Sequence, residues 1–225
     1  MRRVQNLYQS SVGKKIVMAL TGAVLFLFVL VHMLGNLKIY LGAAAFNEYA
    51  AFLREVGHPA LPHGAALWIF RAGLLVAVGL HFLSAAQLYL VSKRARRTGY
   101  KLNDDLSFSY ASRTMRWGGL LLLLFVVYHL LHLTLGSAHP AFEHGAAYEN
   151  VVSGFRVWPV SAFYVLCMLP LGLHIYHGLW SATQTLALQH HTVKKWRRPL
   201  ALGVAAVIVL GNISIPLAVL AGLVR

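Results

Sequence analysis

The chain has 225 residues, of which 58% are hydrophobic and only 12% charged, a composition typical of integral membrane proteins rather than soluble domains. Lysine and arginine number 20 against 6 aspartates and glutamates. The single cysteine, Cys167, excludes an internal disulfide, a zinc knuckle and a cysteine-ligated iron–sulfur cluster on this chain. The covalent haem-attachment pattern C-x-x-C-H is also absent.

Five apolar segments are long enough to cross a membrane, because a hydrocarbon core of about 30 Å requires about 20 helical residues. Their ranges are roughly 16–41, 65–92, 114–136, 159–187 and 200–223. The first is too long for the apolar region of a signal peptide and lacks a small-x-small cleavage site, so we expect it to remain as a span. The sequence therefore predicts an all-α integral membrane protein, a bundle of five transmembrane helices forming one domain over residues 1–225.

The connections between the spans differ in character. Residues 42–66 contain FNEYAAFLREV, whose apolar spacing predicts a short interfacial helix before a Gly-His-Pro turn at 57–59. The segment 137–158 is expected to be irregular, and the segments 93–113 and 188–199 are expected to be basic loops. Local kinks are predicted where proline interrupts a span, at Pro170 and Pro216.

The positive charges are distributed as a topology signal. Most of them lie near the N-terminus, in 93–116 and in 194–198, which share one side of the membrane if five spans alternate. The positive-inside rule then places the N-terminus in the cytoplasm and the C-terminus outside, in a multi-pass protein of the cell's inner, cytoplasmic membrane. No nucleic-acid partner is expected, whereas anionic lipid headgroups or an acidic partner protein would suit this basic face.

Histidine is the ionisable residue buried in these spans, since none of the five contains aspartate or glutamate. A neutral imidazole offers a nitrogen lone pair to a metal, so its burial need not bury a charge. Helix rise places His32 and His129 about 25 Å from the cytoplasmic ends of their spans, and His81 and His174 a similar distance from the outer ends of theirs. The result is two layers, each with one histidine from each of two helices. Two bis-histidine haems need this arrangement, because axial ligands approach iron from opposite faces of a flat macrocycle.

Several alternatives remain open at this point. His129 and His132, like His174 and His177, are three residues apart, so spacing does not say which of each is a ligand and which is a hydrogen-bonding neighbour. A lone histidine in a span is also a common helix-to-helix hydrogen-bond donor. A di-iron membrane hydroxylase or desaturase would need histidine boxes at the cytoplasmic surface, which this spacing does not form. The remaining histidines are expected to be solvated in loops: His58, His63, His139, His144, His190 and His191.

Two segments carry a family resemblance. YQSSVGKKIVMALTGAVLFLFVLVHMLGNLKIYLG and LHIYHGLWSATQTL resemble the single-chain cytochrome b membrane anchor of succinate dehydrogenases and fumarate reductases. The resemblance covers essentially the whole chain and implies a five-helix bundle that holds two haems b, one above the other. It implies an electron-transfer subunit of a tricarboxylic acid cycle enzyme, acting between a membrane quinone, expected to be menaquinone, and an iron–sulfur subunit. Through that subunit it would serve the flavoprotein subunit, where the dicarboxylate chemistry occurs.

The resemblance also implies roles for individual residues. The haem iron ligands would be His81 with His174 toward the cytoplasm and His32 with His129 toward the outside. Haem propionate contacts are implied at Gln9, Ser10 and Arg156, and quinol proton transfer at Glu55 or Glu48. The basic segments 93–116 and 194–198 would dock the iron–sulfur partner. The alternatives are a cytochrome b subunit of another quinone-linked dehydrogenase and a haem-free quinone-binding anchor, and the direction of the reaction, succinate oxidation or fumarate reduction, stays open.

Overall fold

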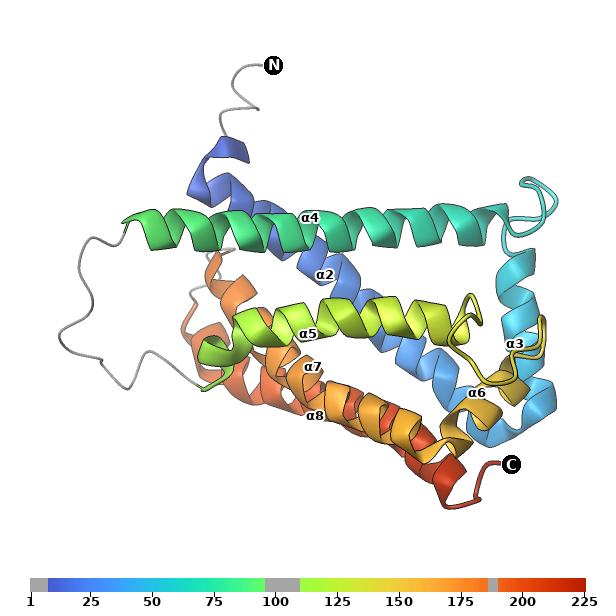
Figure 1. Ribbon diagram of the computed structural model, residues 1–225. Helices are drawn as coiled ribbons and strands as arrows, with labels where there is room; N and C mark the ends of the chain where they lie inside the picture. The colour runs from blue at the N-terminus through green and yellow to red at the C-terminus, as the bar shows by residue number, and fades with distance from the viewer. Residues whose placement is uncertain (1–7, 96–109, 186–189) are drawn as a thin grey trace.

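The computed structural model describes residues 8–95, 110–185 and 190–225, and these residues form helices and connecting turns without a β-strand (Figure 1). In chain order the elements are α2 (Ser11–Asn36), the 3-10 helix η1 (Leu37–Leu41), α3 (Ala43–Glu55), α4 (Ala65–Ala95), α5 (Tyr110–Leu133), α6 (Ala147–Arg156), α7 (Trp158–Thr185) and α8 (His191–Leu220). Five of these helices, α2, α4, α5, α7 and α8, are long and apolar enough to cross a membrane. The predicted all-α, five-span architecture is confirmed.

The five long helices alternate in direction, so the described ends of the chain lie at opposite ends of the bundle (Figure 1). We call one end the basic end: it contains the starts of α2, α5 and α8 and the last turns of α4 and α7. The opposite end, which we call the cap end, contains η1, α3, α6 and the C-terminus. Described cations that belong to the basic end are Lys14, Lys15, Lys93, Arg94, Arg116, Lys195, Arg197 and Arg198.

One face of α2 is a stripe of exposed apolar side chains. Its members recur with the spacing of successive helical turns and are each between 49% and 59% exposed: Leu20, Val24, Leu27, Val31 and Leu34. A soluble protein would bury such a stripe, whereas a helix facing lipid tails leaves it on the outside. The stripe therefore marks the lipid-facing side of α2 and leaves the opposite side for helix contacts.

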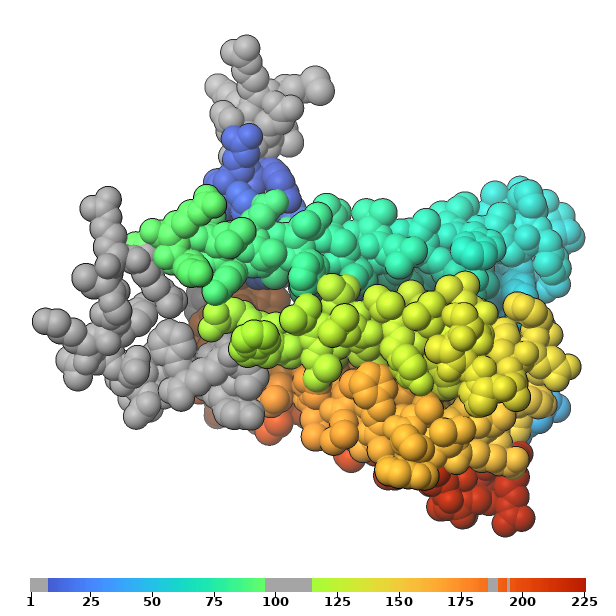
Figure 2. Space-filling view, viewed as in Figure 1, coloured from blue at the N-terminus to red at the C-terminus, as the bar shows by residue number. Residues whose placement is uncertain are grey.

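The long helices pack as two units that share contacts through α2. In one unit α4 packs on α2, and in the other α5 packs on α7, which in turn packs on α8. Among the described residues, the most extensive backbone contacts of α4 are with α2, followed by those with α3. On one face of the molecule α4, α5 and α7 run side by side (Figure 2). Any side chains that join α2 to α5, or α4 to α7, therefore bridge the two units.

The cap end is fixed by a short network of hydrogen bonds. Gly42, with a φ of 92°, makes the turn from η1 into α3, a backbone conformation that L-residues rarely adopt. The Asn47 side chain on α3 accepts a hydrogen bond from the Tyr148 backbone N–H at 2.9 Å and donates one to the Glu149 carboxylate at 3.1 Å. The Tyr148 hydroxyl donates to the Arg225 carbonyl at 3.0 Å. These contacts tie α3, α6 and the C-terminus together.

Two sequence-based expectations for the connections are wrong. The segment 137–158 is not irregular throughout, because α6 forms with Tyr148, Val152 and Phe155 on one buried face. The expected loop 188–199 is helical from His191 onward, since α8 begins there and continues through Pro199. The short helix expected within 42–66 is confirmed as α3. Helices α7 and α8 continue through the two prolines for which kinks were predicted, Pro170 and Pro216.

Candidate functional site

The first histidine pair joins α2 to α5 toward the cap end. The ring centroids of His32 and His129 lie 5.9 Å apart, with their planes at 88°. Phe28 stacks on His32 at a centroid distance of 5.1 Å, which supports that imidazole from one side. Both histidines are half-buried, so the two rings meet within the bundle. We call this the outer pair.

The second pair joins α4 to α7 closer to the basic end, and we call it the inner pair. The ring centroids of His81 and His174 lie 6.0 Å apart, with their planes at 58°. The predicted proximity of both pairs, one histidine from each of four helices, is confirmed. Each pair therefore links one packed unit to the other, and the inner pair bridges α4 to α7.

Helix α2 determines the orientation of the His81 ring. His81 Nδ1 donates a hydrogen bond to the Met18 carbonyl at 3.1 Å and lies 3.3 Å from the Thr21 hydroxyl. A carbonyl only accepts, so Nδ1 carries the proton and Nε2 of the neutral ring keeps a lone pair. A Cβ at Gly22 would lie 3.1 Å from His81 Cε1, so glycine permits this close approach of α2.

The two layers are well separated along α2. Gly22 touches the inner pair and His32 belongs to the outer pair. His32 follows Gly22 by ten residues, which corresponds to about 15 Å of helix. The protein therefore presents two imidazole pairs at two depths along one helix.

The separation of the rings in each pair would suit a metal ion bound by one nitrogen of each imidazole. Metal–nitrogen bonds of about 2.0 Å, with about 1 Å more from each nitrogen to its ring centre, place the two centroids about 6 Å apart. Both observed separations agree with that value. His174 Nδ1 is buried without a hydrogen-bond partner among the described residues, as are His177 Nδ1 and His132 Nε2, so this feature does not separate the pair members from their neighbours. No three His, Cys, Asp or Glu side chains within the described residues converge on one metal position, so the candidate ligands come in pairs.

The neighbouring histidines have other surroundings. His132 is fully buried, and its Nδ1 lies 3.0 Å from the Tyr164 hydroxyl, which confirms the expectation of a hydrogen-bonding neighbour. The same hydroxyl lies 3.4 Å from His129 Nδ1. The His177 ring packs edge-on against Trp180 at a centroid distance of 5.3 Å. The resemblance-based preference for His129 and His174 as pair members agrees with this arrangement.

His139 is not a solvated loop residue, contrary to expectation. It is half-buried and stacks on His132 with ring centroids 4.8 Å apart. Its Nε2 donates to the Asn150 carbonyl at 2.8 Å, and its Nδ1 accepts from the Ala141 N–H at 3.0 Å. These contacts form because the loop folds back on α6. No local sequence pattern predicts that fold. The other five loop histidines are exposed.

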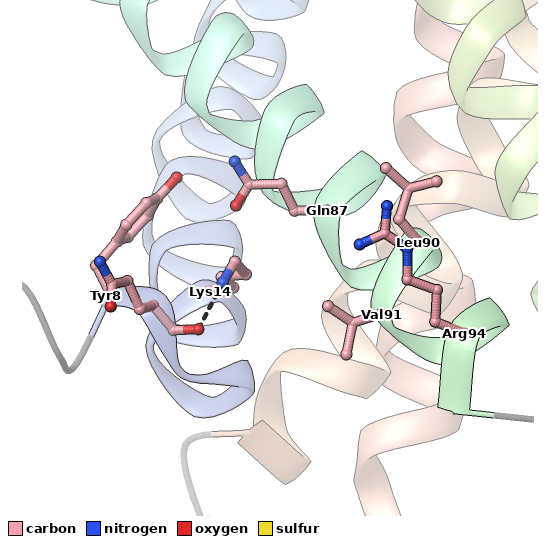
Figure 3. A pocket seen from close by; sticks show the side chains of 7 residues that line it. Tyr8, Lys14, Gln87, Leu90, Val91 and Arg94 are labelled. Atoms are coloured by element: carbon pink, nitrogen blue, oxygen red, sulfur yellow. Dashed lines mark hydrogen bonds between the residues drawn. The ribbon is translucent and has the colours of Figure 1, made fainter.

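Two of the expected propionate contacts lie at the basic end. Ser10 caps α2, and its hydroxyl accepts a hydrogen bond from the Gly13 N–H at 3.0 Å. Gln9 lines a pocket of about 380 Å³ between α2 and α4 (Figure 3). The pocket residues are Tyr8, Gln9, Lys14, Gln87, Leu90, Val91 and Arg94. Lys14 donates to the Gln9 carbonyl at 2.7 Å, the contact dashed in Figure 3, and two cations on one pocket suit an anionic group.

Two arginines differ sharply in their surroundings. Arg156 is exposed and ends α6, which belongs to the cap end together with the outer pair, whereas Gln9 precedes α2 at the basic end. Arg197 on α8 has Nε and Nη1 buried without partners, and its guanidinium lies 5.8 Å from the Trp180 ring centre. Buried guanidinium N–H groups need an acceptor. Sequence reasoning missed Arg197 because it sits in a basic run that a loop would explain equally well.

The two carboxylates considered for proton transfer lie on α3 at the cap end. Glu55 contacts the His63 imidazole at 3.1 Å, and both side chains are more than half exposed. Glu48 is also exposed and lies two helical turns before Glu55, so both face the same side of α3. Their position is on the side of the outer pair.

Comparison of the chain with protein-family models, with curated proteins and with solved structures finds no match.

Proposed function

We propose that the protein is a di-haem cytochrome b, the membrane anchor and electron-transfer subunit of a succinate dehydrogenase or fumarate reductase. The observation that carries this proposal is the presence of two imidazole pairs, each spanning two helices and each spaced for an iron between the rings. The sequence resemblance described above supports the same assignment. The spacing alone would also suit a cytochrome b of another quinone-linked dehydrogenase.

A haem b bound between two histidines supplies reversible one-electron transfer at its iron. The chain's contribution is to hold, separate and orient the ligands. In the inner pair the Met18 carbonyl fixes the tautomer of His81, so Nε2 is the nitrogen free to coordinate. Because α2 contacts both layers, it sets their separation at about 15 Å along its axis. All four histidines are partly buried, which would limit the access of water to both positions.

Polar and charged residues at each end of the bundle would bind the propionate groups at the edges of the haems. Gln9 and Ser10, with Arg197 as an addition from the structure, are proposed to bind propionates of the inner haem. Arg197 is favoured because its buried N–H groups lack an acceptor that a carboxylate would provide. Arg156 is proposed for a propionate of the outer haem, since it lies at the cap end.

The remaining parts of the proposal concern partners and location. A membrane quinone, proposed to be menaquinone, would react near the cap end, with Glu55 or Glu48 exchanging protons. The basic end would dock an iron–sulfur subunit that carries electrons from a flavoprotein subunit. The membrane would be the cell's inner, cytoplasmic membrane, with the basic end in the cytoplasm. The clustered cations at that end support both ideas.

The decisive experiment is a haem count on the purified chain. A pyridine haemochromogen assay should give two haems b per chain for the wild type. Each of four single variants, H32L, H129L, H81L and H174L, should retain one. H144L, which removes an exposed loop histidine, is the matched control and should retain two.

The outcomes separate the alternatives. Absence of haem from the wild type would reject the cytochrome and favour a haem-free quinone-binding anchor. Two haems in the ligand variants would reject the ligand assignment while leaving a cytochrome possible. Purification from native membrane, followed by identification of attached subunits, would distinguish a succinate-linked complex from another dehydrogenase.

A further inference from the structure

Tyr164 on α7 places its hydroxyl between two histidines of α5. The oxygen lies 3.0 Å from His132 Nδ1 and 3.4 Å from His129 Nδ1. Tyr164 is only 6% exposed, and its ring packs edge-on against Phe125 and Phe155, with centroids 5.1 and 4.8 Å away. In these apolar surroundings the two imidazoles are the hydrogen-bond partners that the hydroxyl finds among the described residues. The hydroxyl thus links a candidate iron ligand to a buried histidine.

Coordination would give this chain of hydrogen bonds a direction. If His129 binds iron through Nε2, its Nδ1 must carry a proton, because a neutral imidazole has one of each kind of nitrogen. The Tyr164 oxygen then accepts from His129 Nδ1–H. The tyrosine proton is left to point at His132 Nδ1, which accepts it. Only this order lets all three atoms of the chain take part, and it leaves the proton of His132 on Nε2, which has no hydrogen-bond partner among the described residues.

Packing holds His132 in place, so it can anchor this chain of hydrogen bonds. Tyr128 stacks on one side, with centroids 5.5 Å apart and planes at 11°, and His139 stacks at 4.8 Å. His139 is itself fixed by its bond to the Asn150 carbonyl. With these neighbours in place, His132 Nδ1 keeps its position relative to the Tyr164 hydroxyl.

We propose that Tyr164 and His132 are positioning residues for the outer iron ligand, fixing the rotation of the His129 ring and raising its basicity through Nδ1–H. The proposal rests on the proposed function, because it concerns the ligand of the outer haem. An acceptor on the far nitrogen of a metal-bound histidine donates electron density to the metal. It therefore favours ferric over ferrous iron and lowers the reduction potential of that haem.

The test compares variants by redox titration of the two haems and by their low-spin electron paramagnetic resonance signals. The outer haem is identified as the one that H129L loses. Y164F removes the hydroxyl but keeps the ring and should shift the outer haem to higher potential and change its signal, with the inner haem unchanged. Y128F is the matched control, since it deletes a tyrosine hydroxyl beside the same histidine, and should change neither haem.

Variants of His132 separate hydrogen bonding from packing. H132L should shift the outer haem in the same direction as Y164F but less, because the tyrosine oxygen remains. H132N should return the potential toward the wild-type value, because its side-chain oxygen accepts near the position of Nδ1. An unchanged outer haem in Y164F, or an equal shift in Y128F, would overturn the proposal while leaving the di-haem assignment intact. A wild-type chain without haem would overturn both.

Discussion

Replacing Gly154 on α6 with alanine is expected to destabilise the protein although alanine favours helices. The added Cβ would lie 2.8 Å from His132 Cε1, 2.9 Å from His132 Nε2 and 2.9 Å from His139 Nε2. Real Cβ atoms do not approach so closely, so something must shift. Neither ring can move freely, because His132 bonds to Tyr164 and His139 to the Asn150 carbonyl.

The expected magnitude follows from two opposing effects. Overpacking a rigid core costs about 1–3 kcal/mol. Replacing glycine by alanine within a helix stabilises the folded protein by about 0.5–1 kcal/mol. We therefore expect the free energy of unfolding to fall by about 1 kcal/mol, the difference between the middles of these two ranges.

The measurement is unfolding of the protein in mixed micelles by titration with sodium dodecyl sulfate, followed by far-ultraviolet circular dichroism. G203A on α8 is the matched control, since open space surrounds its added Cβ, and it should be as stable as the wild type or slightly more so. If G154A proved as stable as G203A, the rings would be free to move, and the rigid support inferred for the outer pair would be wrong.

Two further predictions address the cap end and the topology. N47L removes the acceptor for the Tyr148 N–H and the donor to Glu149, and should lower the free energy of unfolding by about 1–3 kcal/mol in the same titration. N47D keeps the acceptor and should lose less unfolding free energy than N47L. Its carboxylate lies beside Glu149, and adding E149Q should relieve the repulsion between the two. Single cysteines at Lys15 or His144, in a chain whose native cysteine is replaced by serine, report the orientation: an impermeant maleimide should label K15C only in broken cells and H144C in intact ones. The reverse pattern would place the basic end outside.

The span architecture could be predicted because it depends on quantities that a sequence displays directly. A membrane helix needs a long apolar run, and the five runs were visible without knowledge of packing. The layers were also visible, since helix rise converts residue number into depth, and it placed His32 level with His129 and His81 level with His174. In the structure the rings of each pair lie about 6 Å apart, as that placement predicted.

The residues around the outer pair could not be predicted, because their contacts are tertiary. Tyr164 precedes His174 by almost three turns and carries no pattern that assigns its hydroxyl to α5. In the sequence His139 looked like any polar loop residue, but the fold stacks it on the buried His132 of α5 and bonds it to Asn150 of α6. Helix α6 itself was missed because its ten residues are flanked by turn-forming residues that suggested a loop.

Helix α2 determines the distance between the two histidine pairs, because it contacts both of them. One segment, around Met18 and Thr21, holds the His81 ring, while His32 lies further along the same unbroken helix. A single residue inserted between Thr21 and His32 would turn one part by about 100° against the other. No repacking of α4 or α5 alone could then restore both alignments. Substitutions between the two layers of this helix can therefore be accepted in evolution, whereas insertions and deletions there cannot. The number of residues between the layers is fixed by the fold.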